Sequence, residues 1–129
     1  MSLTAMACGT LTADLLHAAV INGGFDQIVL INPLISYRSM VQEKNYHIKY
    51  IMSSVPDVIG KYDLPDLVAA LAPVKICMAN PVNALDQPVD NTLFDRTYSA
   101  AKQQYGDTKN FSVVFNAKDI LLHFFQWLD

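Results

Sequence analysis

Short apolar runs alternate along the chain with segments of helical periodicity. The apolar runs cover residues 4–8, 28–31, 74–79 and 111–115, and each ends at a glycine or an asparagine. Continuous apolar runs of this length are typical of strands covered on both faces, as in parallel sheets. Strands that alternate with helices predict right-handed crossovers within one sheet. We therefore expect an α/β/α sandwich in which a parallel sheet of about four strands lies between two helix layers.

The helix predicted from Leu11 is apolar on most of its faces, so we expect it to be largely buried. Thr10 or Thr12 can cap its start, and Gly23 can close its end. The residues that recur at helical spacing, and that we expect to face the core, are Leu11, Leu15, Ala18 and Ala19.

Three further helices are predicted over residues 63–71, 91–105 and 116–128. The first has Pro65 in its opening turn, where the missing N–H costs little. Its predicted buried stripe consists of Leu64, Leu67, Val68 and Leu71. Residues 34–62 lack a clear period, and we interpret them as an insertion with short helices within a single domain that spans residues 1–129.

The composition is apolar for a domain of this size, with 52% hydrophobic and 16% charged residues. Average domains have about 45–50% apolar and about 25% charged residues. The excess suggests surface that is covered by a missing N-terminal part of the parent chain or by a second copy in a homo-oligomer. The net charge of −3 argues against nucleic acid, because no basic stripe is present to neutralise phosphates.

No run of about 18 apolar residues predicts a membrane span, and the start of the chain does not resemble a signal peptide. The cellular location stays open. Cys8 and Cys77 are too few for a disulfide framework, and we expect both to be small buried residues. Neither the cysteines nor the histidines have the spacing of a metal site, and no phosphate-binding or dinucleotide-binding motif occurs. The sequence predicts no cofactor and no metal.

Two segments are more specific than generic β/α patterning. The first is Tyr62-Asp63-Leu64-Pro65-Asp66-Leu67 with the following Val68–Pro73 and strand 74–79. It resembles the stretch before the penultimate strand of bacterial acetyl xylan esterase-like α/β hydrolases. The second, from Gly9-Thr10-Leu11-Thr12 through Ser36-Tyr37-Arg38-Ser39, looks like the nucleophile-elbow strand, its helix and the next strand of that family. The resemblance covers the C-terminal half of the fold, a partial α/β-hydrolase fold, and implies that strand 4–8 is left as an open edge.

This resemblance implies where a Ser-acid-His triad would lie. The nucleophile position falls on Gly9, which has no side chain, and a shift of one residue would place it on Cys8. Thr10 fits a helix cap better than a nucleophile. The acid position falls on Asn83, an amide, and Asp86 lies three residues on. Asp86 reads more simply as a solvated loop residue.

The histidine position falls near Lys118 or Asp119, and neither is a histidine. His123 lies one turn into the last predicted helix, among apolar residues, where a packing role is the simpler interpretation. His17 lies in the middle of a helix and His47 in the insertion, and neither has a partner at a useful spacing. All three positions of the triad (Gly9, Asn83, Asp119) are therefore altered, which predicts lost catalysis.

The leading hypothesis is a non-catalytic hydrolase-like module of a carbohydrate-esterase-related protein, which acts in domain packing or in binding, with carbohydrate as a candidate ligand. The alternative is a carboxyl or acetyl esterase with Cys8 as nucleophile, His123 as base and Asp86 as the orienting acid. A third hypothesis is a structural domain that associates with itself.

Overall fold

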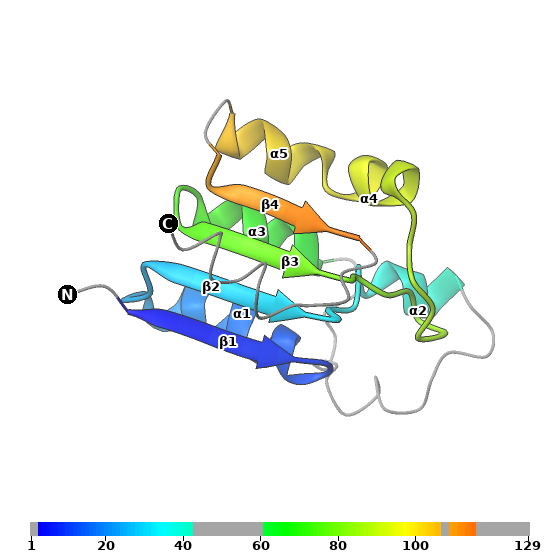
Figure 1. The fold of residues 1–129 in the computed structure, drawn as a ribbon, viewed down its shortest axis with the longest axis horizontal. Coiled ribbons are helices and arrows are strands. Elements are labelled where there is room, and N and C mark those ends of the chain that lie inside the picture. The colour runs from blue at the N-terminus through cyan, green and yellow to red at the C-terminus, as the bar shows by residue number, and fades with distance from the viewer. Residues whose placement is uncertain (1–2, 43–60, 107–108, 116–129) are drawn as a thin grey trace.

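The computed structural model describes residues 3–42, 61–106 and 109–115. The described strands form one sheet in the order β1-β2-β3-β4, and every neighbouring pair is parallel (Figure 1). The strands are β1 (Thr4–Cys8), β2 (Gln27–Ile31), β3 (Lys75–Ala79) and β4 (Phe111–Val114). The parallel sheet of four strands matches the predicted α/β class, and β1 lies at its edge as expected.

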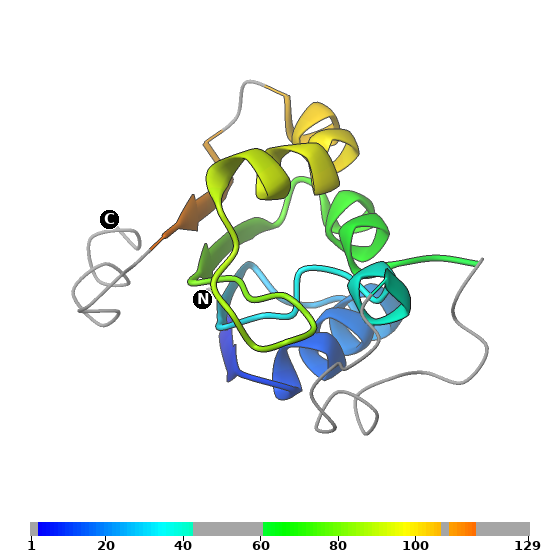
Figure 2. The ribbon, with the colours of Figure 1, turned by 90° about the vertical axis from the view of Figure 1, so that its right-hand side faces the viewer.

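The helices of the described residues lie on one face of this sheet (Figures 1 and 2). They are α1 (Leu11–Asn22), α2 (Arg38–Gln42), α3 (Leu64–Leu71), α4 (Asn91–Thr97) and α5 (Ser99–Tyr105). The prediction of short helices in the insertion 34–62 is met by α2, while residues 43–60 lie outside the described residues. The described residues form one helix layer, and the helix predicted over residues 116–128 lies outside them.

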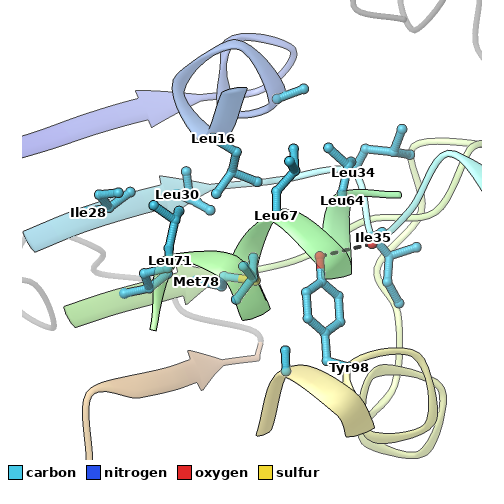
Figure 3. Close-up of a cluster of buried hydrophobic side chains, with 14 of the residues drawn as sticks. Leu16, Ile28, Leu30, Leu34, Ile35, Leu64, Leu67, Leu71, Met78 and Tyr98 are labelled. Carbon is cyan, nitrogen blue, oxygen red and sulfur yellow. Dashed lines mark hydrogen bonds between the residues drawn. The ribbon is translucent and has the colours of Figure 1, made fainter. Parts of the chain in front are cut away.

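The core lies between the sheet and these helices. Ile28, Leu30 and Met78 are fully buried and point from the two central strands toward the helices (Figure 3). Ile76, two residues before Met78, is fully buried in the same cluster. Side chains alternate between the two faces of a strand, so Val29 and Cys77 point to the opposite face, where both are also buried. Burial on both faces explains why these strands have continuous apolar sequences.

The start of α3 is fixed by several local hydrogen bonds. The Asp63 carboxylate accepts the N–H of Leu64 at 2.7 Å. It also accepts the backbone N–H of Asp66, whose own carboxylate accepts the N–H of Asp63 at 2.8 Å, and these two reciprocal bonds form a capping box. Leu64, Leu67, Val68 and Leu71 are buried. The predicted stripe of this helix is confirmed.

The predicted face of α1 is confirmed only in part. Ala19 is buried and Leu15 packs against the core, but Leu11 is 61% exposed, and the other buried residues of this helix are Thr12, Ala13 and Leu16. Val20 and Ile21 are also exposed, so the helix is not largely buried. Because α1 carries apolar residues on most of its faces, the sequence pattern does not distinguish the face that packs on the sheet. The predicted close of the helix at Gly23 is confirmed, with φ at +66°.

The single helix predicted over residues 91–105 is divided at Tyr98 into α4 and α5. The Tyr98 ring is buried and stacks on Phe94 with ring centroids 4.6 Å apart. Its hydroxyl donates to the Ile35 carbonyl at 2.9 Å (Figure 3). This long-range bond ties the loop after β2 to the break between the helices, a tertiary contact that the local sequence does not reveal.

Candidate functional site

The carboxyl ends of the parallel strands lie at the same end of the sheet, where α/β proteins have their ligand sites. The residues after β1, β2 and β3 share one conformation: Gly9, Asn32 and Asn80 have φ of +65°, +53° and +54°. Each donates its backbone N–H to the carbonyl oxygen of the last residue of the neighbouring strand, with an N···O distance of 2.8 Å. The turn after β1 and the loop after β3 therefore lie at the same end of the sheet, which is the arrangement that the resemblance predicts.

Gly9 occupies the strand-to-helix turn between β1 and α1. Its carbonyl accepts both the N–H of Thr12 at 3.2 Å and the Thr12 hydroxyl at 2.7 Å. A Cβ atom at Gly9 would meet no heavy atom within 4 Å, so the turn leaves open space where a nucleophile side chain would stand. Thr10 makes no side-chain cap bond, so the expected threonine cap is replaced by this Thr12–Gly9 contact.

The two cysteines differ in their environments. Cys8, at the end of β1, is exposed, so the expectation that it is a buried strand residue is wrong. It lies on an edge strand, which the described residues cover on one side only, and the local apolar run did not signal this. Cys77 in β3 is buried as expected, and burial raises the pKa of its thiol, against smaller opposing effects of Ser112 and Lys75. Of the two thiols, Cys8 is thus the accessible one.

Asn83 is engaged in the structure of its own loop. Its side-chain oxygen accepts the N–H of Leu85 at 2.9 Å and that of Gln87 at 3.0 Å. Asp86 lies within this turn, with φ at +63°, and is exposed, as the interpretation of a solvated loop residue predicts. Asp119 and His123, the other two residues of the hypothesis, lie outside the described residues.

His17 has a partner that the sequence did not indicate, because the two residues are 45 positions apart. Its Nδ1 lies 2.7 Å from the Ala13 carbonyl, and its Nε2 lies 2.8 Å from the Tyr62 hydroxyl. A carbonyl only accepts, so Nδ1 carries a proton, and in the neutral ring Nε2 accepts from Tyr62. Tyr37 lies beside them, with its ring centroid 6.4 Å from that of His17. The sequence offered His17 no partner at a useful spacing, and the fold supplies one from a distant segment.

Burial dominates the electrostatics of the tyrosines in this part of the molecule. It raises the pKa of Tyr37 to about 12, and smaller contributions come from Tyr62, Asp14 and Asp63. Burial also raises the pKa of Tyr105 to about 12, and that of Tyr98 well above the usual tyrosine range. These hydroxyls therefore stay protonated near neutral pH.

A polar groove opens beside α3, between the loop after β2 and helices α4 and α5. Its volume is about 640 Å³. The groove is lined by Ser36, Arg38, Asp63, Pro65, Asp66, Leu93, Arg96, Thr97, Ser99 and Ala100. Sequence reasoning missed this groove, because its walls come from four segments spread between residues 36 and 100. Arg38 itself stood in one of the segments that carry the family resemblance.

Within residues 3–42, 61–106 and 109–115, no three His, Cys, Asp or Glu side chains gather as metal ligands would. None of the helices in these ranges is long and apolar enough to cross a bilayer. Comparisons with protein-family models, with curated proteins and with solved structures found no match to the chain.

Proposed function

We propose that the chain is a non-catalytic module, similar to the C-terminal half of an acetyl xylan esterase-like hydrolase, that packs against another protein segment. The surface for this packing is the β1–α1 edge, defined by Leu3, Met6, Leu11, Val20 and Ile21. The observation that carries the proposal is that these five are the exposed large hydrophobic residues of the described chain, and that all lie within residues 3–21.

The backbone of β1 supports the same conclusion. Gly9 donates to Ile31 of β2, and the Leu3 carbonyl accepts the N–H of Gln27. Backbone groups alternate between the two sides of a strand, so Ala5 and Ala7 also point toward β2. Thr4, Met6 and Cys8 then present their N–H and C=O groups to the open side, where no described strand pairs with them. Such an edge is a template for an added strand.

Apolar side chains flank this open backbone on both faces of the sheet. Met6 pairs in register with Val29 and lies on the face opposite the helices. Leu11 and Ile21 are exposed on α1, which covers the other face of the sheet, and Ile21 is 78% exposed. A strand added beside β1 would place its own side chains next to Met6. Burial of apolar area at about 25 cal/mol per Å² would then add to the hydrogen bonds of the new pair.

The absence of catalysis in the proposal is supported by Gly9 and Asn83. The turn that would present a nucleophile carries no side chain at Gly9, and the Asn83 oxygen is engaged by two backbone donors of its own loop. Purified protein should therefore hydrolyse p-nitrophenyl acetate no faster than the Cys8→Ala variant. A turnover that Cys8→Ala removes would contradict this part of the proposal.

The packing surface is tested by Met6→Lys and Ile21→Lys, with Gln103→Lys as a matched control that adds the same charge to an exposed site on α5. Both edge variants should keep the stability of the wild type within about 0.5 kcal/mol, as is usual at exposed sites. They should also bind less of the dye 8-anilinonaphthalene-1-sulfonate, whereas the control should not. Edge variants that unfold, or whose dye binding equals that of the control, would contradict an exposed apolar edge.

A self-associating domain is a second use of the same edge. In that case sedimentation velocity would show a dimer of the wild type that Met6→Lys dissociates and Gln103→Lys leaves intact. A dimer that survives both edge substitutions would show that the contact lies elsewhere.

The exposure of Cys8 at the end of β1 favours a third candidate, an esterase that uses this thiol. A nucleophilic cysteine needs a depressed thiol pKa. This candidate therefore predicts that iodoacetamide alkylates Cys8 at pH 7 much faster than it alkylates glutathione. Alkylation at or below the rate of glutathione would exclude it.

A further inference from the structure

The chain contains two arginines, Arg38 and Arg96, and both line the groove beside α3. Arg38 is the first residue of α2, and Arg96 lies in the last turn of α4, at 58 positions' distance along the chain. Both side chains are exposed. The fold therefore brings two distant guanidinium groups to the walls of one groove, in a chain whose net charge is −3.

Neither guanidinium group is engaged within the part of the chain that the structure describes. Neither forms a side-chain hydrogen bond or an ion pair there, whereas the nearby Lys102 ammonium pairs with Asp95. A guanidinium has five N–H donors in a planar fork that fits carboxylate and phosphate oxygens. Within the described residues, the donors of both arginines are thus left for a ligand.

The two carboxylates of the groove accept hydrogen bonds from backbone N–H groups. Asp63 accepts the N–H groups of Tyr37 at 2.6 Å, of Leu64 at 2.7 Å and of Arg38 at 3.3 Å. Asp66 accepts the N–H of Asp63 at 2.8 Å. These bonds hold the start of α3 against the turn that carries Arg38. The carboxylates therefore position the groove wall, and they do not form ion pairs with the arginines.

We propose that this groove binds a small oxyanion of the carboxylate or phosphate class through Arg38 and Arg96. Its volume, about 640 Å³, lies within the roughly 300–1,000 Å³ of small-molecule sites. Hydroxyl groups line the walls at Ser36, Thr97 and Ser99. The Thr97 hydroxyl donates to the Leu93 carbonyl, so it serves a ligand as an acceptor only. A hydroxylated anion therefore fits the lining better than an apolar acid.

The site lies apart from the β1–α1 edge, because no residue of β1 or α1 lines the groove. The inference is therefore independent of the proposed packing function. Failure of one leaves the other in place.

Isothermal titration calorimetry of the full chain with inorganic phosphate, with glucuronate and with glucose tests the proposal. Phosphate, glucuronate or both should bind at one site, and the tighter of the two identifies the source of the oxyanion. Glucose, which lacks the charge, should bind at least about 10-fold more weakly than the anion, because charged hydrogen bonds are stronger than neutral ones. Binding should also weaken as salt is raised.

Arg38→Gln and Arg96→Gln should each weaken anion binding about 10- to 100-fold, as expected for the loss of a charge-assisted hydrogen bond. Lys109→Gln, which removes the same charge at an exposed site outside the groove, should leave it unchanged. Arg38→Lys should fall between wild type and Arg38→Gln, because it keeps the charge without the fork. Unchanged melting temperatures would confirm that the variants are folded, since both arginines are exposed.

The proposal is overturned if neither anion binds at about 10 mM in folded protein. It is equally overturned if binding survives both glutamine substitutions, or if Lys109→Gln weakens it as much as they do, since the attraction would then be a general effect of net charge.

Discussion

Helices α1 and α3 pack on the same face of the sheet, but their apolar residues differ in how far they are exposed to solvent. Each begins with a leucine: Leu64 is 1% exposed, whereas Leu11 is 61% exposed. Helix α3 covers the centre of the sheet and has a helix on each side, so its apolar stripe is buried within the domain. Helix α1 lies over the edge strand, and several of its apolar residues are exposed. The difference is the basis of the proposal that the edge, and not the centre, packs against another protein segment.

The largest expected effect is that of Leu64→Ala. Truncation of a fully buried leucine should lower the free energy of unfolding by about 2–5 kcal/mol. Leu11→Ala, the matched change at the start of α1, should alter it by no more than about 0.5 kcal/mol. Urea titration monitored by circular dichroism measures both. Equal losses would mean that Leu11 is buried, and the contrast between the helices would fail.

The N-terminal caps of the same two helices provide a second contrast. Asp63→Ala removes the acceptor of the Tyr37, Arg38 and Leu64 N–H groups, and should cost about 2–3 kcal/mol, because buried donors lose their partner. Thr10→Ala removes no side-chain cap bond and should cost less than about 0.5 kcal/mol. Asp63→Asn, which keeps an acceptor oxygen, should fall between them. A Thr10→Ala loss as large as that of Asp63→Ala would contradict the assignment of caps.

These contrasts also show how far the sequence could predict the fold. Helix α3 was predictable because its signals agree: Pro65 in the first turn and one clear apolar stripe. The strands were predictable because burial on both faces gives them continuous apolar runs. The face of α1 was not, since apolar residues surround the helix and only the tertiary fold selects which of them meet the sheet. The break at Tyr98 likewise depends on a bond to Ile35 from another segment.

The candidate site was predictable in part. The position of Gly9 between a strand and a helix followed from local sequence, and so did the loop position of Asp86. The exposure of Cys8 depends on its place at the sheet edge, and the pairing of His17 with Tyr62 depends on the packing of α1 beside residues that precede α3. The groove formed around Arg38 and Arg96 requires the whole topology. Local patterns carry no information on such pairs, because their residues are 45 and 58 positions apart.

Alkaline pH should act on the tightly packed region and spare the edge. The pKa of Tyr37 is raised from 10.0 to about 12 in the folded protein. Its contribution to stability is therefore complete below pH 10 and is lost as the pH rises toward 12, because the unfolded chain ionises first. Between pH 10 and pH 12, each such tyrosine lowers the free energy of unfolding by up to about 1.4 kcal/mol per pH unit. Urea titrations at pH 9, 10 and 11 should show this fall, and Tyr37→Phe should reduce its slope. A slope that Tyr37→Phe leaves unchanged would assign the effect to other groups.

Amide hydrogen exchange in β1 tests the central claim, an open sheet edge, most directly. In monomeric protein the N–H groups of Ala5 and Ala7, which point toward β2, should exchange slowly. Those of Thr4, Met6 and Cys8 should exchange quickly, and the strand should show an alternating pattern by nuclear magnetic resonance. Uniform slow exchange along β1 in the monomer would mean that the edge is already paired, and the proposed docking surface would not exist.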